Sequence, residues 1–188
     1  PRYRPIRGRL VIEVPAELFA PAESSSFDGV FDMGSFDCGP DAYTCSQPMK
    51  YHVLVSNVGG ALLVGGTVEG EVTTSCGRCL EDVVIPIKGE VEGYFIIEGE
   101  GEAPEDMDED EFDVLPESHI IDLESLLRAA VLVDLPLVPL CDEECLGICS
   151  QCGHNLNEGP CECRASEQDE ISLGKNNPFA ALKGISFD

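Results

Sequence analysis

Apolar and polar residues alternate between positions 50 and 97, with the period of two that is typical of strands. Within residues 67–73, for example, the valines share one face and the glutamates share the other. The pattern predicts strands over residues 52–58, 61–64, 67–73, 83–87 and 91–97. Gly59 and Gly60 separate the first two strands and suit the two-residue turn of a hairpin. We therefore expect a mainly antiparallel sheet.

The period changes to that of a helix over residues 122–133. Leu123, Leu127 and Val131 recur on one stripe of this helix, and Asp122 can accept a hydrogen bond as its N-cap. Two prolines in the segment that follows stop the helix and restrict strand pairing. One principal helix is therefore expected beside the sheet.

Other parts of the chain predict irregular structure. Residues 20–49 are rich in serine, glycine, aspartate and proline, as loops are. Residues 98–113 carry ten acidic residues and no lysine or arginine, so self-repulsion favours a disordered or extended segment. Such a run could imitate a phosphate backbone for a basic partner, although a solvated loop is the commoner explanation. A short amphipathic element in the tail, over residues 177–185, is expected to dock on the body of the protein.

The net charge narrows the classes of partner. The 188 residues include 36 acidic and 11 basic ones, for a formal charge of −25. A field of that sign repels phosphate backbones and attracts basic proteins, including ribosomal proteins. Four of the eleven basic residues lie within residues 1–9. A solvated leader is the favoured interpretation of this segment, and a local patch that binds nucleic acid is the alternative.

No apolar run is long enough to span a membrane, and the arginine-rich start lacks the apolar region of a secretory signal. We therefore expect a cytoplasmic protein with no membrane partner. A reducing compartment favours metal-bound cysteines over disulfides.

Eight cysteines have the spacing of metal ligands. They are Cys76, Cys79, Cys141, Cys145, Cys149, Cys152, Cys161 and Cys163. Two Cys-x-x-Cys turns among them, which we call knuckles, can each present two sulfurs to one ion, and zinc is held by four such ligands in a tetrahedron. Structural zinc supplies about 10–16 kcal/mol in small peptides, enough to fold a segment this poor in apolar residues. The prediction is one or two structural zinc ions.

The spacing leaves three pairings open. The two knuckles, Cys76/Cys79 and Cys149/Cys152, could share one ion and tie the C-terminal segment to the sheet. Alternatively, the second knuckle could close a site locally with two of the other C-terminal cysteines, or all eight could fill two sites. Cys38 and Cys45 lie in a predicted loop without a knuckle and are expected to be free thiols. His154 is the weaker candidate ligand, because it lacks a second histidine at zinc-finger spacing.

Redox chemistry and structural disulfides are the alternatives for these cysteines. A thioredoxin-like pair would lie at a helix N-terminus, which lowers the thiol pKa, whereas these pairs adjoin predicted strands and loops. The chain also lacks a phosphate-binding glycine loop and a Gly-x-Ser-x-Gly nucleophile turn. We expect no enzymatic activity. A thiol-disulfide oxidoreductase using one Cys-x-x-Cys pair is the catalytic alternative.

Three segments of the chain resemble motifs of one known protein family. The first is Cys76-Gly-Arg-Cys79-Leu80-Glu81, the second runs from Ala130 to Cys163 and contains the other six cysteines, and the third is Asn177-Pro-Phe-Ala-Ala-Leu-Lys183. Together they resemble the YceD-like family of bacterial and plastid proteins, which are linked to accumulation of large-subunit ribosomal RNA. The resemblance covers roughly the C-terminal two thirds of the chain.

The resemblance implies a non-catalytic factor in large ribosomal subunit biogenesis. Its expected partner is a ribosomal protein or a large-subunit assembly intermediate, with any contact to ribosomal RNA indirect, because the chain is so acidic. We hypothesise that the acidic segment, residues 98–113, shields the RNA-binding surface of such a client. A zinc-stabilised adaptor unrelated to ribosomes is the remaining alternative.

The expected fold class is α+β, a mainly antiparallel sheet with one principal helix and a C-terminal cysteine-rich zinc module. Residues 1–140 are expected to form the α+β domain, and residues 141–188 the zinc-binding segment and tail.

Overall fold

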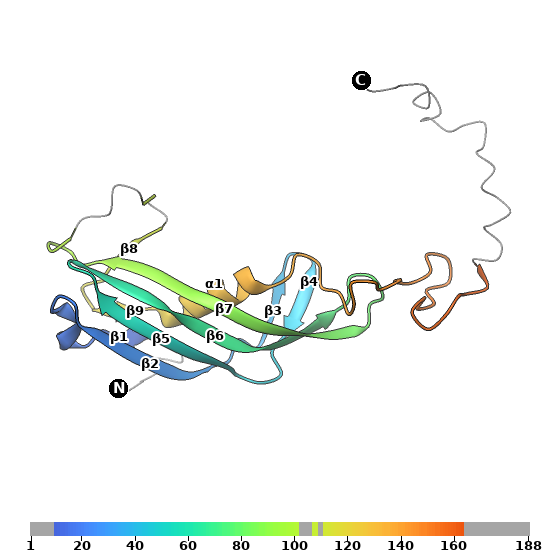
Figure 1. The fold of residues 1–188 in the computed structure, drawn as a ribbon, viewed down its shortest axis with the longest axis horizontal. Coiled ribbons are helices and arrows are strands. Elements are labelled where there is room, and N and C mark those ends of the chain that lie inside the picture. Colours follow the sequence, from blue (N-terminus) through green and yellow to red (C-terminus); the bar gives the residue numbers. More distant parts are fainter. Residues whose placement is uncertain (1–9, 102–106, 109–110, 164–188) are drawn as a thin grey trace, which may run out of the picture.

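A hairpin of two long strands forms the centre of the sheet. The computed structural model describes residues 10–101, 107–108 and 111–163 (Figure 1). Strands β6 (Ala61–Ser75) and β7 (Asp82–Ile96) pair antiparallel over their whole length. The alternation had predicted four shorter strands here, and the structure joins them in pairs. Pro86 is tolerated inside β7 because, among the described residues, the outer edge of that strand pairs only at Phe95 and Ile96.

The other strands extend the sheet from β6. Strand β5 (Met49–Asn57) pairs with β6, and β2 (Ser24–Phe31) pairs with β5. Strands β3 (Ser35–Cys38) and β4 (Asp41–Thr44) form a short hairpin that reaches β6 at Thr73. The turn between β5 and β6 is the predicted one, with φ of +92° at Gly59 and +90° at Gly60.

The prediction of a loop over residues 20–49 is wrong, because β2, β3 and β4 all lie within it. Strand β2 is an outer strand whose residues are exposed or half-buried up to Phe31, and its inward positions include Ser25 and Gly29, so the sequence carries little apolar alternation. The backbone ladder with β5 holds this strand in place, and composition alone does not reveal that pairing.

Short elements complete the described part of the chain. A 3-10 helix, η1 (Ala16–Phe19), follows β1 (Ile12–Glu13), and β1 pairs with β9 (Ile120–Ile121) in a separate two-stranded sheet. Strand β8 (Asp113–Val114) pairs in parallel with the end of β7. The acidic segment therefore ends in a strand, while its residues 102–106 and 109–110 lie outside the described residues.

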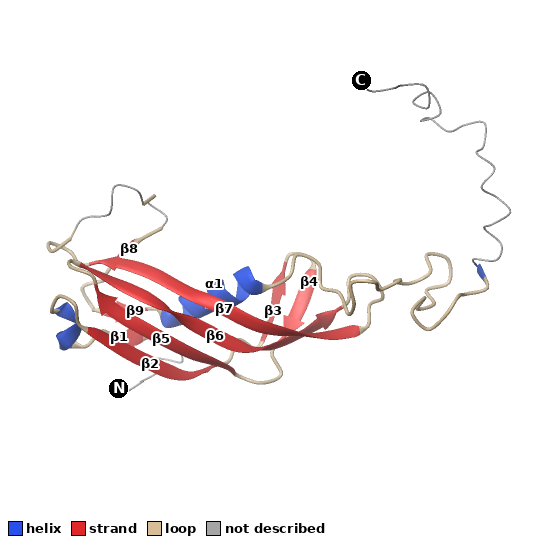
Figure 2. Ribbon diagram, in the orientation of Figure 1, coloured by secondary structure: helices blue, strands red, loops and turns tan. Residues whose placement is uncertain are grey.

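The predicted helix is confirmed as α1 (Leu123–Asp134), which lies along one face of the sheet (Figure 2). The Asp122 carboxylate accepts the Ser125 N–H at 3.3 Å, so it is the N-cap. Leu127 and its stripe are buried against β6 and β7. Gly89 permits this close approach, since a Cβ there would collide with the carbonyl group of Ala130.

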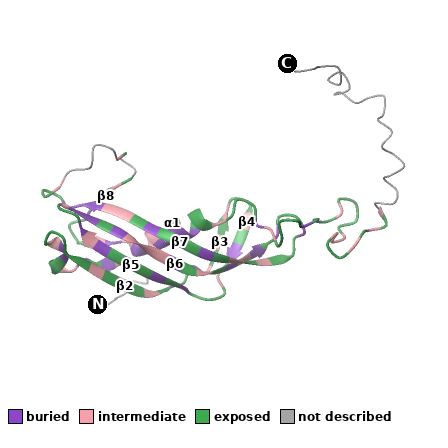
Figure 3. Ribbon diagram, viewed as in Figure 1, coloured by how far each residue is buried: buried purple, intermediate pink, exposed green. Residues whose placement is uncertain are grey.

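The core lies between α1 and the inward face of the sheet, and buried and exposed positions alternate along the strands (Figure 3). Strand β5 shows this most regularly, with Val53 and Val55 buried while Lys50, His52 and Leu54 are exposed. The opposite sheet face has no layer over it among the described residues. The predicted α+β fold class is confirmed.

Some expectations concern residues that the structure does not describe. The arginine-rich residues 1–9 and the tail from residue 164 lie outside the described residues, so the predicted docking of the tail is one of these. The division into domains at residue 140 stays a prediction. Among the described helices, none is both long and apolar enough to cross a membrane.

Candidate metal centres

The eight predicted ligands come together as two groups of four sulfurs. The first group is Cys76, Cys79, Cys141 and Cys145, and the second is Cys149, Cys152, Cys161 and Cys163. Within each group the sulfur atoms all lie within 4.8 Å of one another. The fold therefore places the two knuckles in different groups, so they are not paired around a single ion, and the second knuckle groups locally with two other C-terminal cysteines.

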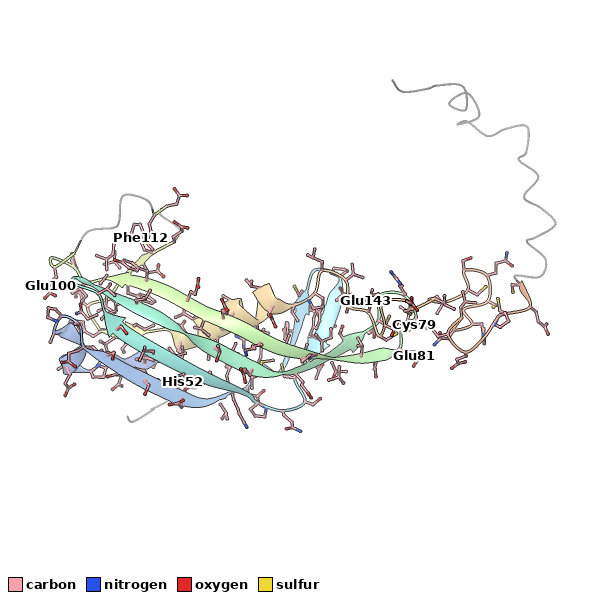
Figure 4. The ribbon with its side chains drawn as sticks, in the orientation of Figure 1. His52, Cys79, Glu81, Glu100, Phe112 and Glu143 are labelled. Carbon is pink, nitrogen blue, oxygen red and sulfur yellow. The ribbon has the colours of Figure 1, made fainter. Side chains whose placement is uncertain are left out.

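The first knuckle lies in the turn between β6 and β7, as predicted. The Cys76 N–H donates to the Glu81 carbonyl at 2.8 Å, and the Leu80 N–H donates to the Cys76 carbonyl at 2.9 Å. These two bonds close the turn and direct both sulfurs to the same side. The knuckle therefore stands at the end of the β6–β7 hairpin, at the end of the sheet far from β8 (Figures 1 and 4).

The segment after α1 supplies the other two ligands of the first group. The chain leaves the helix at Leu135, and the Pro139 carbonyl accepts the Gly77 N–H at 2.8 Å, so the chain is tied to the knuckle just before Cys141. Cys145 follows one turn later, with its N–H donating to the Asp142 carbonyl at 3.1 Å. Residues about sixty positions apart thus share one site.

The sulfur separations fit a tetrahedral zinc ion. Four sulfurs at about 2.3 Å from a central zinc ion lie about 3.8 Å from one another. The Sγ atoms of Cys76 and Cys145 are 3.9 Å apart, and those of Cys79 and Cys141 are 3.6 Å apart. None of the ten cysteines, all of which are described, forms a disulfide. The first group therefore has the donor set and the spacing for one ion.

Hydrogen bonds favour a thiolate at Cys76. Burial acts to raise the pKa of this thiol, but backbone N–H groups, including those of Arg78 at 3.5 Å and Cys141 at 3.4 Å, lower it to about 6. Neighbouring cysteines, Cys145 first, raise the pKa of Cys141 to about 12. Four thiolates in so small a volume repel one another unless a cation lies between them, which is the condition that a bound metal ion satisfies.

Two side chains support the first group from outside. The Arg78 guanidinium donates through Nη1 to the carbonyl oxygens of Glu143 at 2.9 Å and Cys145 at 3.0 Å, so it caps two carbonyl groups of the segment that follows α1. The Asn157 amide donates through Nδ2 to the Cys145 sulfur at 3.3 Å, while its Oδ1 accepts the Leu146 N–H at 2.7 Å. The pattern of cysteines gave no signal for Asn157, because it belongs to the loop of the other group.

The second group is built within residues 149–163. The Gly153 N–H donates to the Cys149 carbonyl at 2.9 Å, which repeats the turn of the first knuckle. A short antiparallel bridge between Ile148 and Asn155 braces this turn. Backbone N–H groups of Cys152 and Gln151 lower the pKa of Cys149 to about 6, whereas Cys152 and other neighbours raise that of Cys163 to about 11. The electrostatic pattern of the first group recurs here.

The remaining candidate ligands lie outside both groups. Cys38 and Cys45 pack at the edge of the hydrophobic core, as thiols that belong to neither group. His154 contributes its carbonyl, which accepts the Cys149 N–H at 2.8 Å, and its ring belongs to neither group.

Asn157→Asp is expected to weaken metal binding at the first group by about 10–100-fold, as loss of an outer-shell partner commonly does. Aspartate keeps the acceptor for Leu146 but replaces the N–H donor with a negative charge beside the Cys145 sulfur. Asn155→Asp is the matched control, because Asn155 Oδ1 only accepts hydrogen bonds from Asn157. Competition with a chromogenic chelator measures both variants, and equal affinities in the two would contradict a supporting role for Asn157.

Residues 64–186 match the family model described as Large ribosomal RNA subunit accumulation protein YceD. The matched range contains both groups of cysteines, β7 and α1. No solved structure matches the chain.

Individual relatives agree with this match over shorter ranges. A protein of Arabidopsis thaliana described as "Large ribosomal RNA subunit accumulation protein YCED homolog 1, chloroplastic" is 36% identical over 62 residues, which are 33% of this chain and 19% of its own length. An uncharacterized protein of Mycobacterium tuberculosis is 34% identical over 110 residues, 56% of this chain and 50% of its own length. One of Mycobacterium leprae is 29% identical over 109 residues, 58% of this chain and 49% of its own. The chain thus spans half or less of these relatives' lengths.

Proposed function

Because the chain belongs to the YceD family of large ribosomal RNA subunit accumulation proteins, we propose that it is a non-catalytic factor in biogenesis of the large ribosomal subunit. It supports accumulation of large-subunit RNA by binding a ribosomal protein or an assembly intermediate. The observation that carries the proposal is the family match over residues 64–186, which includes both cysteine groups. The cytoplasm is the compartment where this work would take place.

The charge of the chain supports a protein client over direct binding of RNA. With 36 acidic and 11 basic residues, the chain repels phosphate backbones and attracts the basic surfaces with which ribosomal proteins bind RNA. The acidic segment, residues 98–113, is the densest source of that field. In this proposal it covers the RNA-binding surface of the client until assembly.

A structural role for metal is supported by the completeness of both groups. Each offers four thiols, so a zinc ion bound there has no open coordination position for substrate or water. We propose one zinc ion in each group, with Cys76, Cys79, Cys141 and Cys145 holding the first. The ions would fold the knuckles and leave no reactive thiolate, which argues against an oxidoreductase.

Isolation of the tagged protein from its native cells, with and without RNase, tests the proposed client. We expect ribosomal proteins of the large subunit to co-purify well above a control protein of equal acidity and to remain after RNase treatment. Raising the salt concentration is expected to reduce their recovery, because exposed charges are screened. Quantitative mass spectrometry and RNA sequencing of the eluates measure both partners.

A variant in which the acidic residues of 98–113 become the corresponding amides separates the two parts of the proposal. Unchanged recovery and unchanged salt dependence would contradict the role of the acidic segment. Absence of both ribosomal proteins and large-subunit RNA from wild-type eluates, in cells that are making ribosomes, would contradict the function itself and favour an adaptor unrelated to ribosomes.

A further inference from the structure

The first knuckle contains a leucine in a conformation that leucine rarely adopts. Leu80 has φ of +64°, in the left-handed region that favours glycine, and its side chain is 63% exposed. The equivalent position of the second knuckle is Gly153, with φ of +72°. Packing within the described chain therefore does not explain Leu80, and such an outlier is a reason to look for a function.

Other exposed apolar side chains lie on the segments that meet the first knuckle. Val138 lies against Gly77 of the same knuckle, and the Ile148 N–H donates to the Arg78 carbonyl at 3.2 Å, so both segments meet there. Leu146, 63% exposed, adjoins the buried ligand Cys145. We call these four residues, Leu80, Val138, Leu146 and Ile148, the knuckle patch. Exposed apolar residues gathered in this way mark interaction sites more often than residues scattered singly do.

Acidic side chains border the knuckle patch. They are Glu81, Asp82, Asp142, Glu143 and Glu144, all of them exposed. Glu81 and Glu143 both lie beside Cys79 at this end of the sheet (Figure 4). The basic residue within the knuckle, Arg78, directs its guanidinium to two backbone carbonyls. The patch is therefore apolar in the middle and negative at its border.

We propose that the knuckle patch is the docking surface for a basic amphipathic segment of a partner protein, with apolar side chains on the leucines and lysine or arginine on the acidic border. Charge complementarity identifies this occupant. The negative border would repel the phosphates of RNA and of anionic lipid. A second copy of the chain would bring two negative borders together, which would also repel each other. The inference rests on the proposed function, because that function supplies a basic client, and it adds where the client binds.

The test uses a fluorescein-labelled amphipathic peptide of leucine and lysine, with the leucines at helical spacing. A second peptide has the same lysines but serine in place of every leucine. Fluorescence anisotropy with the full-length, metal-loaded protein should show tighter binding of the leucine peptide. Leu80→Asn is expected to weaken that binding by about tenfold or more, as loss of a central apolar contact does. Its metal content and melting temperature should remain those of wild type, since asparagine tolerates positive φ.

Two matched controls separate the knuckle patch from general effects. Leu54→Asn makes the same change at a leucine that is 43% exposed on the outer face of β5, and it should leave binding unchanged. Glu143→Gln with Glu144→Gln is expected to weaken binding severalfold and to reduce its salt dependence. Glu90→Gln with Glu92→Gln, which removes the same charge from exposed positions of β7, should have a smaller effect.

Equal binding by the Leu80 and Leu54 variants would overturn the proposal, as would equal binding of the two peptides. Self-association of the wild type that Leu80→Asn abolishes would overturn it in favour of a second copy. The peptide assay contains no ribosomal component, so it can fail separately from the proposed function. Peptide binding that depends on Leu80, without ribosomal proteins in the eluates, would count against the function and leave the docking surface standing.

Discussion

Cys76→Ser is expected to reduce the metal content of the protein from two zinc ions to one and to unfold the end of the molecule around the first knuckle. Cys76 is fully buried, and its sulfur accepts the N–H groups of Arg78 and Cys141. Serine lacks the soft thiolate that zinc prefers, and three remaining ligands hold the ion far less tightly. The affected segment depends on this ion, because between residues 141 and 163 only Cys145 and Gly147 are buried.

The unfolding caused by Cys76→Ser should be confined to the end of the molecule around the first knuckle. Structural zinc supplies about 10–16 kcal/mol in small peptides, which exceeds what so little buried apolar surface can replace. The core between α1 and the sheet is separate from the cluster of cysteines that would hold the ion, so the sheet should stay folded. Amide hydrogen exchange would show faster exchange in the knuckle and in residues 139–148, with β5 and the centre of β6 unchanged.

Metal analysis of purified, reduced protein measures the stoichiometry directly, and Cys45→Ser provides the control. Cys45 is a thiol at the edge of the core that belongs to neither group, so its variant should retain two ions. Two ions in the Cys76 variant would contradict the first site. Wild-type protein that is isolated without metal and is fully protected from exchange at the knuckle would contradict the structural role of zinc in this chain.

The sequence was sufficient to select the eight candidate ligands but not to show how they divide into two groups. Spacing identifies a knuckle because it is a local property of four or five residues. Which knuckle closes with which cysteines depends on the path of the chain after α1, and the contact between Gly77 and Pro139 determines that path. A contact between positions so far apart leaves no periodic signal, so the assignment of Cys141 and Cys145 to the first site required the structure.

The same distinction between local and distant information applies to the fold. The helix, its N-cap at Asp122 and the turn at Gly59 were predictable, because each depends on neighbouring residues. The polar strand β2 was not, since it is held by backbone pairing with β5. The join between the predicted strands 83–87 and 91–97 was also missed, because the intervening Lys88, Gly89 and Glu90 offer no apolar residue, and their pairing with β6 is a property of the folded sheet.

The second large effect concerns the core, where Leu127→Ala is expected to lower the free energy of unfolding by about 2–5 kcal/mol. Leu127 is fully buried on the stripe of α1 that faces β6 and β7, and alanine would leave a cavity that the paired strands cannot close. Leu132→Ala on the same helix is the matched control, because Leu132 is 40% exposed and its loss should cost a few tenths of a kcal/mol. Urea unfolding followed by circular dichroism measures both variants, and equal midpoints would show that α1 does not stabilise the sheet. Since Cys76 and Cys79 are positioned by the β6–β7 hairpin while the second group lies within residues 149–163, unfolding of the sheet should release the first ion and leave the second bound.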